Sequence, residues 1–137
     1  MASRLAPSIS PDTEFFWSGL KERQLRIQRC TDCQTLRVPP RPMCANCQSL
    51  NWDYVESTGR GTVYSFVMPK YPPLPFIQYP YIVALIELDE GVRIVSNLCD
   101  IAPEAVTNGL RVEVFFDAFE ALPSGEELVL HQFRPAR

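Results

Sequence analysis

The sequence lacks the short motifs that mark several large enzyme families. It contains no G-x-G-x-x-G fingerprint, no phosphate-binding P-loop and no G-x-S-x-G nucleophile elbow, which exclude the usual dinucleotide, nucleotide and serine-hydrolase patterns. Histidine occurs once, as His131, and neither sequence neighbour is a hydroxyl or a carboxylate. Because imidazole is the commonest general base, this scarcity argues against a catalyst that works alone. A small enzyme using His131, Cys99 or Glu87 stays a minor alternative.

Long apolar segments are missing as well. The longest uninterrupted apolar run, residues 81–86, has six residues, whereas a transmembrane helix needs about 20. The chain opens MASRLAPSISPDTEFF, without the basic stretch and apolar stretch of a secretory leader. We therefore expect a cytoplasmic protein with no membrane partner, in a compartment that keeps thiols reduced.

Glycine is scarce and basic charge is limited. Six glycines stand against 13 prolines, and 46% hydrophobic with 21% charged residues is typical of a globular chain. Residues 1–61 hold eight Lys/Arg against six Asp/Glu, whereas residues 62–137 hold five against ten. An acidic C-terminal half opposes binding to nucleic-acid phosphates, so we expect no nucleic-acid partner. A zinc-ribbon and barrel module that binds nucleic acid remains the alternative hypothesis.

Cysteine, by contrast, is present in a specific pattern. Two C-x-x-C pairs, Cys30 with Cys33 and Cys44 with Cys47, are separated by ten residues. Each pair can aim two sulfurs at one ion, and four thiolates form a closed tetrahedral shell. We predict structural Zn²⁺, with rubredoxin-type iron and disulfides as alternatives. A redox role is not expected, because these pairs lack a strand-to-helix βαβ context.

The remaining pattern predicts a mostly β protein. Pro11-Asp12-Thr13 before Glu14 indicates a helix start with a side-chain cap, and residues 25–28 alternate as a short strand. Five further strands are expected at 62–68, 81–88, 92–99, 111–116 and 128–133, with one helical turn at 103–106. This order suits a small five-stranded closed barrel of the OB type. We divide the chain into a helical arm (1–24), a zinc ribbon (25–58) and an OB-fold domain (59–137).

The segment from Pro69 to Tyr81 is unusually apolar for a loop. Its only polar side chains besides the tyrosines are Lys70 and Gln78, and it carries five prolines. Stiff prolines lower the entropic cost of presenting aromatic rings to a partner or ligand. The alternative interpretation is that the rings fold back and cap the barrel.

The paired cysteine turns joined by V-P-P-R-P, the stretch G-R-G-T-V-Y-S and the hairpin A-L-I-E-L-D-E-G-V-R resemble domain-of-unknown-function family thirty-five. The resemblance covers residues 12–135. It implies a helical arm, a rubredoxin-like zinc ribbon and an OB fold. The family pattern usually has glycine where this chain has Gln34 and Gln48.

The resemblance also implies a working arrangement. Members are similar to non-catalytic subunits that pair with a thiolase-like (lipid-transfer-type) enzyme in a hetero-oligomer and share its acyl-CoA substrate. Retro-aldol cleavage of steroid side-chain CoA esters, a lyase reaction, is the preferred setting; acetyl-transfer and condensation assemblies are the alternative. Guanidinium groups bind phosphates in pairs, and aromatic rings can cover an apolar group. The candidate acyl-CoA or partner contacts are therefore Arg29, Arg37, Arg41, Arg60, Tyr71, Phe76, Tyr79 and Tyr81.

Overall fold

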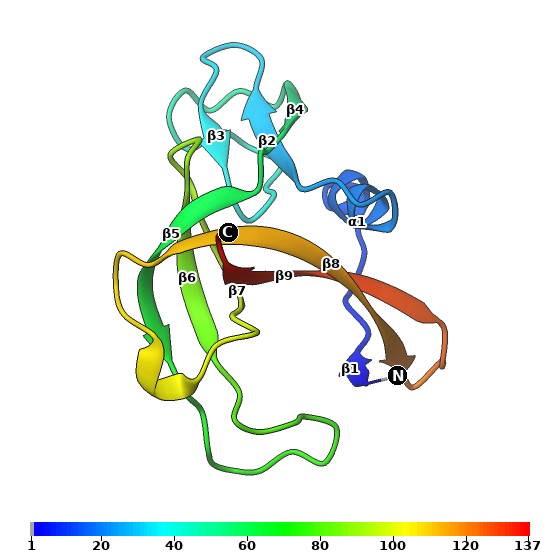
Figure 1. Ribbon diagram of the computed structural model, residues 1–137. Coiled ribbons are helices and arrows are strands. Elements are labelled where there is room, and N and C mark those ends of the chain that lie inside the picture. Colours follow the sequence, from blue (N-terminus) through cyan, green and yellow to red (C-terminus); the bar gives the residue numbers. More distant parts are fainter. Residues whose placement is uncertain (1) are drawn as a thin grey trace.

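The computed structural model describes residues 2–137, and strands dominate that part of the chain (Figure 1). In chain order the elements are β1 (Ser3–Leu5), α1 (Glu14–Lys21), β2 (Arg26–Cys30), β3 (Leu36–Arg37), β4 (Trp52–Glu56), β5 (Arg60–Val67), β6 (Val83–Leu88), β7 (Arg93–Asn97), the 3-10 helix η1 (Pro103–Ala105), β8 (Arg111–Leu122) and β9 (Glu127–Pro135). No helix in residues 2–137 is long and apolar enough to span a bilayer.

The smaller sheet is the ribbon. Its strand order is β3-β2-β4, with both pairs antiparallel. The predicted strand at 25–28 is confirmed as part of β2, whereas β3 and β4 were not predicted. Strand β4 pairs with β2 along its whole length, from Arg26 opposite Glu56 to Cys30 opposite Trp52. In Figure 1 the three strands of the ribbon lie above the larger sheet.

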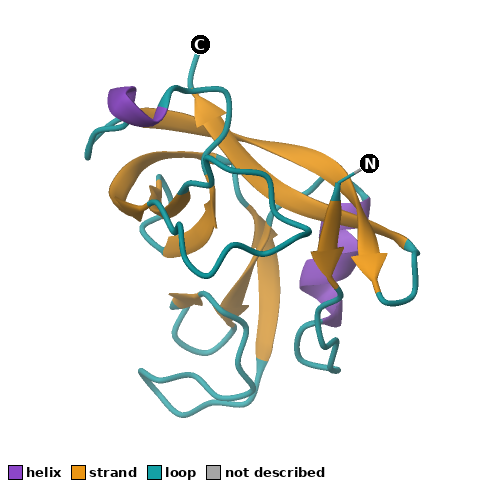
Figure 2. Cartoon of the chain, turned by 90° about the horizontal axis from the view of Figure 1, so that it is seen from below, coloured by secondary structure: helices purple, strands orange, loops and turns teal. Residues whose placement is uncertain are grey.

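The larger sheet curls into the OB fold. Its order is β1-β8-β5-β6-β7, and β9 pairs with the other edge of β8. All five predicted strands and the helical turn are present, so the fold class is confirmed. The sheet does not close through a continuous ladder; β7 meets β9 near the single bridge Leu98–Phe133. Strand β1 adds a sixth member by pairing in parallel with the far end of β8, as Figure 2 shows.

Helix α1 packs on both sheets through one apolar face. Phe16, Gly19 and Leu20 are its buried residues, and they lie against β9 and β2. The predicted side-chain cap is wrong: Thr13 occupies the N-cap without a capping hydrogen bond. Its hydroxyl instead accepts a hydrogen bond from the Ser10 amide at 2.9 Å. A local turn has therefore taken the oxygen that a cap would use.

One continuous core joins the three parts of the chain. Leu20 of the helix, Leu25 and Ile27 of the ribbon, and Ile86 and Phe133 of the barrel are at most 1% exposed and belong to the same cluster. Each fully buried side chain of this size contributes about 1.5–3 kcal/mol. The division into arm, ribbon and barrel stays a prediction, because these segments share their interior.

Candidate functional site

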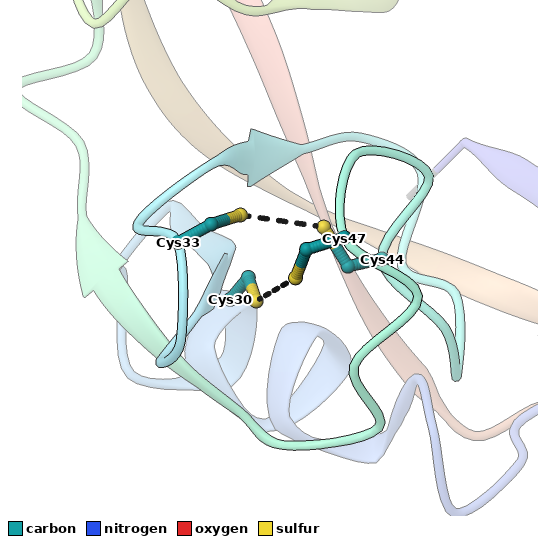
Figure 3. A group of neighbouring side chains, drawn as sticks. All are labelled: Cys30, Cys33, Cys44 and Cys47. Carbon is teal, nitrogen blue, oxygen red and sulfur yellow. Dashed lines mark hydrogen bonds between the residues drawn. The ribbon is translucent and has the colours of Figure 1, made fainter.

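Four sulfur atoms meet in the ribbon (Figure 3). All four Sγ atoms lie within 4.8 Å of one another, and the pairs Cys30–Cys47 and Cys33–Cys44 are each 3.6 Å apart. Tetrahedral zinc with bonds of about 2.3 Å sets its sulfurs about 3.8 Å apart, whereas disulfide sulfurs are about 2.0 Å apart. The four cysteines are therefore positioned to bind a metal ion, as the predicted zinc cofactor requires, and they form no disulfide.

The two cysteine turns are built alike. In each turn the backbone N–H of a glutamine, Gln34 or Gln48, donates a hydrogen bond of 2.9 Å to the carbonyl oxygen of the first cysteine. Both glutamines have positive φ, 67° and 62°, a conformation that glycine adopts at lower cost. Each side-chain amide donates back to its own turn, to Thr31 O at 3.0 Å and Ala45 O at 3.4 Å. These bonds support the same turn geometry without glycine.

The environment of Cys33 favours its thiolate, and the four sulfur atoms leave no open position on a metal. Cys30 and Cys44 are buried, at 0% and 1% exposure. Hydrogen bonds from Asn46 and Thr35 lower the pKa of Cys33 to about 5, and the thiolate is the form that binds metal. With four sulfur ligands a zinc ion stabilises the ribbon and does not activate water.

A buried amide ties the ribbon to the proline bridge, residues 38–42. Gln28 is 1% exposed. Its Oε1 accepts from the Arg41 amide at 2.8 Å and from Arg37 Nε at 2.9 Å, and its Nε2 donates to Arg41 O at 2.9 Å. These bonds satisfy the buried amide and hold Arg37 and Arg41 side by side. Gln28 was not among the predicted site residues, because an isolated glutamine within a strand carries no signal of its partners.

Two of the predicted arginines line one basic depression. Arg37 and Arg41, with Arg93, line a hollow of about 380 Å³ between β3 and the β6–β7 hairpin. Glu87 is the carboxylate in this lining, and it pairs with Arg93 Nε at 3.1 Å. Arg37 and Arg41 form no ion pair within residues 2–137. Three guanidinium groups and one carboxylate therefore make the depression positively charged.

The other two predicted arginines do not line this depression. Arg29 makes a bidentate pair with Asp53 across β2 and β4, with Nε and Nη2 at 2.8 and 2.6 Å from the two carboxylate oxygens. This hydrogen-bonded pair lowers the pKa of the Asp53 carboxyl. Arg60 is exposed at the start of β5. Arg29 is thus occupied within the ribbon.

The predicted aromatic residues lie on the loop between β5 and β6. Tyr71, Tyr79 and Tyr81 line a hollow of about 470 Å³, and Tyr71 is 88% exposed. Phe76 is half-buried and is not part of that lining. Figure 1 shows this loop at the end of β5 and β6 opposite the ribbon. Five of the eight candidate contacts therefore line two hollows at opposite ends of the barrel, and the eight form no single site.

Comparison with known proteins agrees with this architecture. Residues 17–53 match the family model of the ChsH2 rubredoxin-like zinc ribbon domain, and residues 54–117 match that of the ChsH2 C-terminal OB-fold domain. A DUF35 domain-containing scaffold protein of Methanocaldococcus jannaschii is 37% identical over 103 residues, 73% of each chain. The solved structure of an Ltp2-ChsH2(DUF35) aldolase superposes with a TM-score of 0.84 at 46% identity, covering 96% of this chain and 100% of that one. The chain belongs to the DUF35 family.

Two further relatives carry enzyme-subunit names. A probable enoyl-CoA hydratase alpha subunit of Thermomonospora curvata is 47% identical over 135 residues, which are 98% of this chain and 41% of that protein. The benzoylsuccinyl-CoA thiolase subunit BbsA of Thauera aromatica is 27% identical over 93% of this chain and 92% of its own. This DUF35 chain thus spans about two fifths of the hydratase subunit and nearly all of the thiolase subunit.

The three acidic residues at the β6–β7 hairpin of this DUF35 chain have structural partners, and the surroundings of Cys99 disfavour its thiolate. Glu87 pairs with Arg93, and Asp89 pairs with Arg111 at 2.9 Å. The Glu90 carboxylate accepts hydrogen bonds from Ser57 and Thr58. Burial and, to a smaller extent, the negative charge of Asp100 raise the pKa of Cys99. A raised thiol pKa opposes a nucleophilic role. These contacts account for the side chains without acid–base chemistry.

His131 has a partner that the sequence concealed. The Ser96 hydroxyl lies 2.7 Å from His131 Nδ1, although the two residues are 35 positions apart. The ring packs edge-on against Phe16 and Phe133, with centroids 5.8 and 6.4 Å away. Burial lowers the pKa of His131 to about 4. His131 is therefore packed in the protein interior, as expected. Its hydrogen-bond partner Ser96 was not predicted.

The low pKa of His131 predicts a loss of stability in mild acid. Because the unfolded-state pKa is near 6.5 and the folded-state pKa is about 4, the unfolded chain binds more protons in that window. We expect the free energy of unfolding to fall by about 2 kcal/mol between pH 7 and 5 through this group. Urea titrations of the wild type and His131→Gln measure it; the variant should lack that part of the slope. Equal pH slopes for both proteins would contradict the assignment.

Proposed function

We propose that this chain is a non-catalytic accessory subunit that pairs with a thiolase-fold enzyme and helps to form its acyl-CoA channel. The observation that carries the proposal is the proline-stiffened loop 69–81, which leaves aromatic rings in solvent. Tyr71 is 88% exposed, and Leu74 and Tyr79 are each 40% exposed. Exposed apolar clusters of this kind mark interaction sites. Similarity to the thiolase subunit and to the aldolase supports an enzyme partner.

The basic depression supplies the second part of the proposal. Coenzyme A carries a pyrophosphate and a 3′-phosphate, and guanidinium groups bind phosphates with paired hydrogen bonds. Arg37 and Arg41 are held beside each other by Gln28 and have no carboxylate partner in the described residues. We assign the CoA phosphates to this depression and the partner or the acyl group to the aromatic loop. Arg29, Arg60 and Phe76 are weaker contact candidates.

The proposed reaction belongs to the partner enzyme. Within residues 2–137 the nucleophile candidates are not activated: Cys99 has a raised pKa, the carboxylates near β6 are paired, and the Ser96 hydroxyl beside His131 donates to the His131 carbonyl oxygen. Retro-aldol cleavage of a steroid or other long acyl-CoA ester is our preferred class, supported by similarity to the named aldolase. A condensation or acetyl-transfer thiolase is the second candidate, favoured by similarity to the thiolase subunit.

Co-expression with a thiolase-fold enzyme tests the proposal, and a thiolase-fold protein encoded beside this chain would be the first candidate. We expect the two proteins to co-purify and acyl-CoA turnover to need both of them. Tyr71→Ser with Tyr79→Ser should weaken the complex at least about tenfold by removing two aromatic anchors. Leu50→Ser, at an exposed ribbon position, is the matched control and should leave it intact. Full turnover by the partner alone, without co-purification, would overturn the proposal.

The phosphate assignment has its own variant. Gln28 contacts Arg41 only through the backbone N–H and carbonyl of that residue. The Arg41 guanidinium makes no hydrogen bond within the described chain. Arg41→Gln should therefore keep the fold and raise KM for the CoA ester about five- to tenfold, with kcat unchanged. Arg137→Gln, near the C-terminus, is the control. An unchanged KM in Arg41→Gln would remove the depression from the substrate path.

A further inference from the structure

A second apolar groove lies where the three parts of the chain meet. It has a volume of about 570 Å³ and is separate from the aromatic loop. Helix α1 contributes Phe16 and Trp17, the proline bridge contributes Pro39 and Pro40, and the barrel contributes Val95 together with its neighbours on β6 and β7. Sites for small molecules typically occupy about 300–1,000 Å³. The groove therefore has the size and lining of a ligand site.

His131 is the imidazole in the lining of this groove. The Ser96 hydroxyl lies 2.7 Å from His131 Nδ1 and 3.1 Å from the His131 carbonyl oxygen. A hydroxyl has one proton, and a carbonyl can only accept. Both contacts are hydrogen bonds when the hydroxyl donates to the carbonyl and Nδ1–H donates to the hydroxyl oxygen. This network assigns the proton to Nδ1.

That tautomer leaves Nε2 as a hydrogen-bond acceptor without a partner. No described residue of the chain makes a hydrogen bond to Nε2. The low pKa of the ring keeps the imidazole neutral at physiological pH. In the protein alone Nε2 is free to accept a hydrogen bond from water, and a ligand that displaces this water without supplying a donor leaves the acceptor unsatisfied. A ligand that fills the groove therefore gains from a donor aimed at Nε2.

The surrounding charge selects the kind of donor. Arg93 is the charged residue in the lining, and Glu87 neutralises it at 3.1 Å. An ammonium or a carboxylate in this apolar groove would lose hydration without a counter-ion. A neutral hydroxyl on an apolar skeleton supplies a donor to Nε2 and adds no unpaired charge to the groove. We propose that this groove binds a neutral, largely apolar alcohol whose hydroxyl donates a hydrogen bond to His131 Nε2.

Two probes that differ only in the donor test the site on the intact, metal-loaded chain. The first is 1-adamantanol and the second is 1-methoxyadamantane, which has the same cage and no hydroxyl proton. Trp17 lines the groove, so its fluorescence reports binding once Trp52→Phe removes the other tryptophan. We expect the alcohol to bind about five- to tenfold more tightly than the ether, the effect of one hydrogen bond. Calorimetry checks the same ratio without fluorescence.

The control removes the acceptor and keeps the ring. In His131→Phe the affinity for the alcohol should fall to that for the ether, and the affinity for the ether should stay within about twofold. Nitrogen NMR of His131 in the unaltered protein decides the case should that variant fail to fold: Nδ1 should be protonated, and the Nε2 signal should move on adding the alcohol. Equal wild-type affinities for the two probes, or a proton on Nε2, would overturn the proposal. Neither readout involves the partner enzyme, so the outcome is independent of the proposed function.

Discussion

Cys44→Ser is expected to abolish stoichiometric metal binding and to unfold the ribbon. Cys44 is 1% exposed, and its sulfur lies 3.6 Å from that of Cys33, so serine would leave a buried hydroxyl where the metal needs a thiolate. Binding of structural zinc supplies about 10–16 kcal/mol in small zinc-finger peptides. The three-stranded ribbon has only two residues in β3 and depends on that energy. Its loss should exceed the effect of any single core truncation.

Metal content and unfolding measured together check this expectation. The wild type should hold one zinc per chain and be colourless; rubredoxin-type iron would give a red protein. Cys99→Ser is the matched control, because the Cys99 thiol lies outside the four-sulfur cluster. That variant should keep its metal and unfold within a few degrees of the wild type. A Cys44→Ser protein with full metal content and an intact ribbon would contradict the closed four-thiolate site.

The metal ligands were predictable because their geometry is local. Two residues between paired cysteines fix each turn, so ligand identity follows from spacing alone. The glutamines after each pair show what spacing cannot reveal. Their backbone takes the positive φ expected of glycine, and only their side-chain bonds to Thr31 and Ala45 show how the turn is supported.

The barrel was predictable in its strands and less so in its edges. Alternating apolar residues located β5 to β9, but β8 extends to Leu122 and not to Phe116 as expected. Its second half is held by β9 along one edge and by β1 along the other. Strand β1 is three residues long and pairs with residues more than a hundred positions away. Such pairing leaves no periodic signal in a short segment.

The candidate contacts were predictable as residue types and not as one place. Composition identified the arginines around the ribbon and the rings of loop 69–81, but the fold sets them at opposite ends of β5 and β6 (Figure 1). The pairing of Arg29 with Asp53 depends on the register of β2 and β4. The pairing of Ser96 with His131 depends on β7 meeting β9. Both are tertiary facts that no sequence spacing encodes.

Gly61→Ala is expected to destabilise the barrel strongly, although it adds only one methyl group. A Cβ at Gly61 would lie 2.4 Å from the carbonyl oxygen of Glu87 and 3.0 Å from Ile86 Cγ2. The first atom is backbone of the paired strand β6, so a side-chain movement cannot relieve the clash. The strands must separate where Gly61 pairs with Leu88. We expect a cost of about 3 kcal/mol, measured as the free energy of unfolding in urea with zinc present.

Gly109→Ala separates crowding from backbone strain. Gly109 has a φ of +90°, and an added Cβ there would meet no atom within 4 Å, so only the conformational cost of about 1 kcal/mol applies. Gly61 has the opposite combination, with ordinary φ and no space. If the close approach of β5 and β6 is the reason for glycine at position 61, Gly61→Ala must lower the free energy of unfolding more than Gly109→Ala does. Equal losses, or a larger loss at Gly109, would show that β5 and β6 can move apart at little cost.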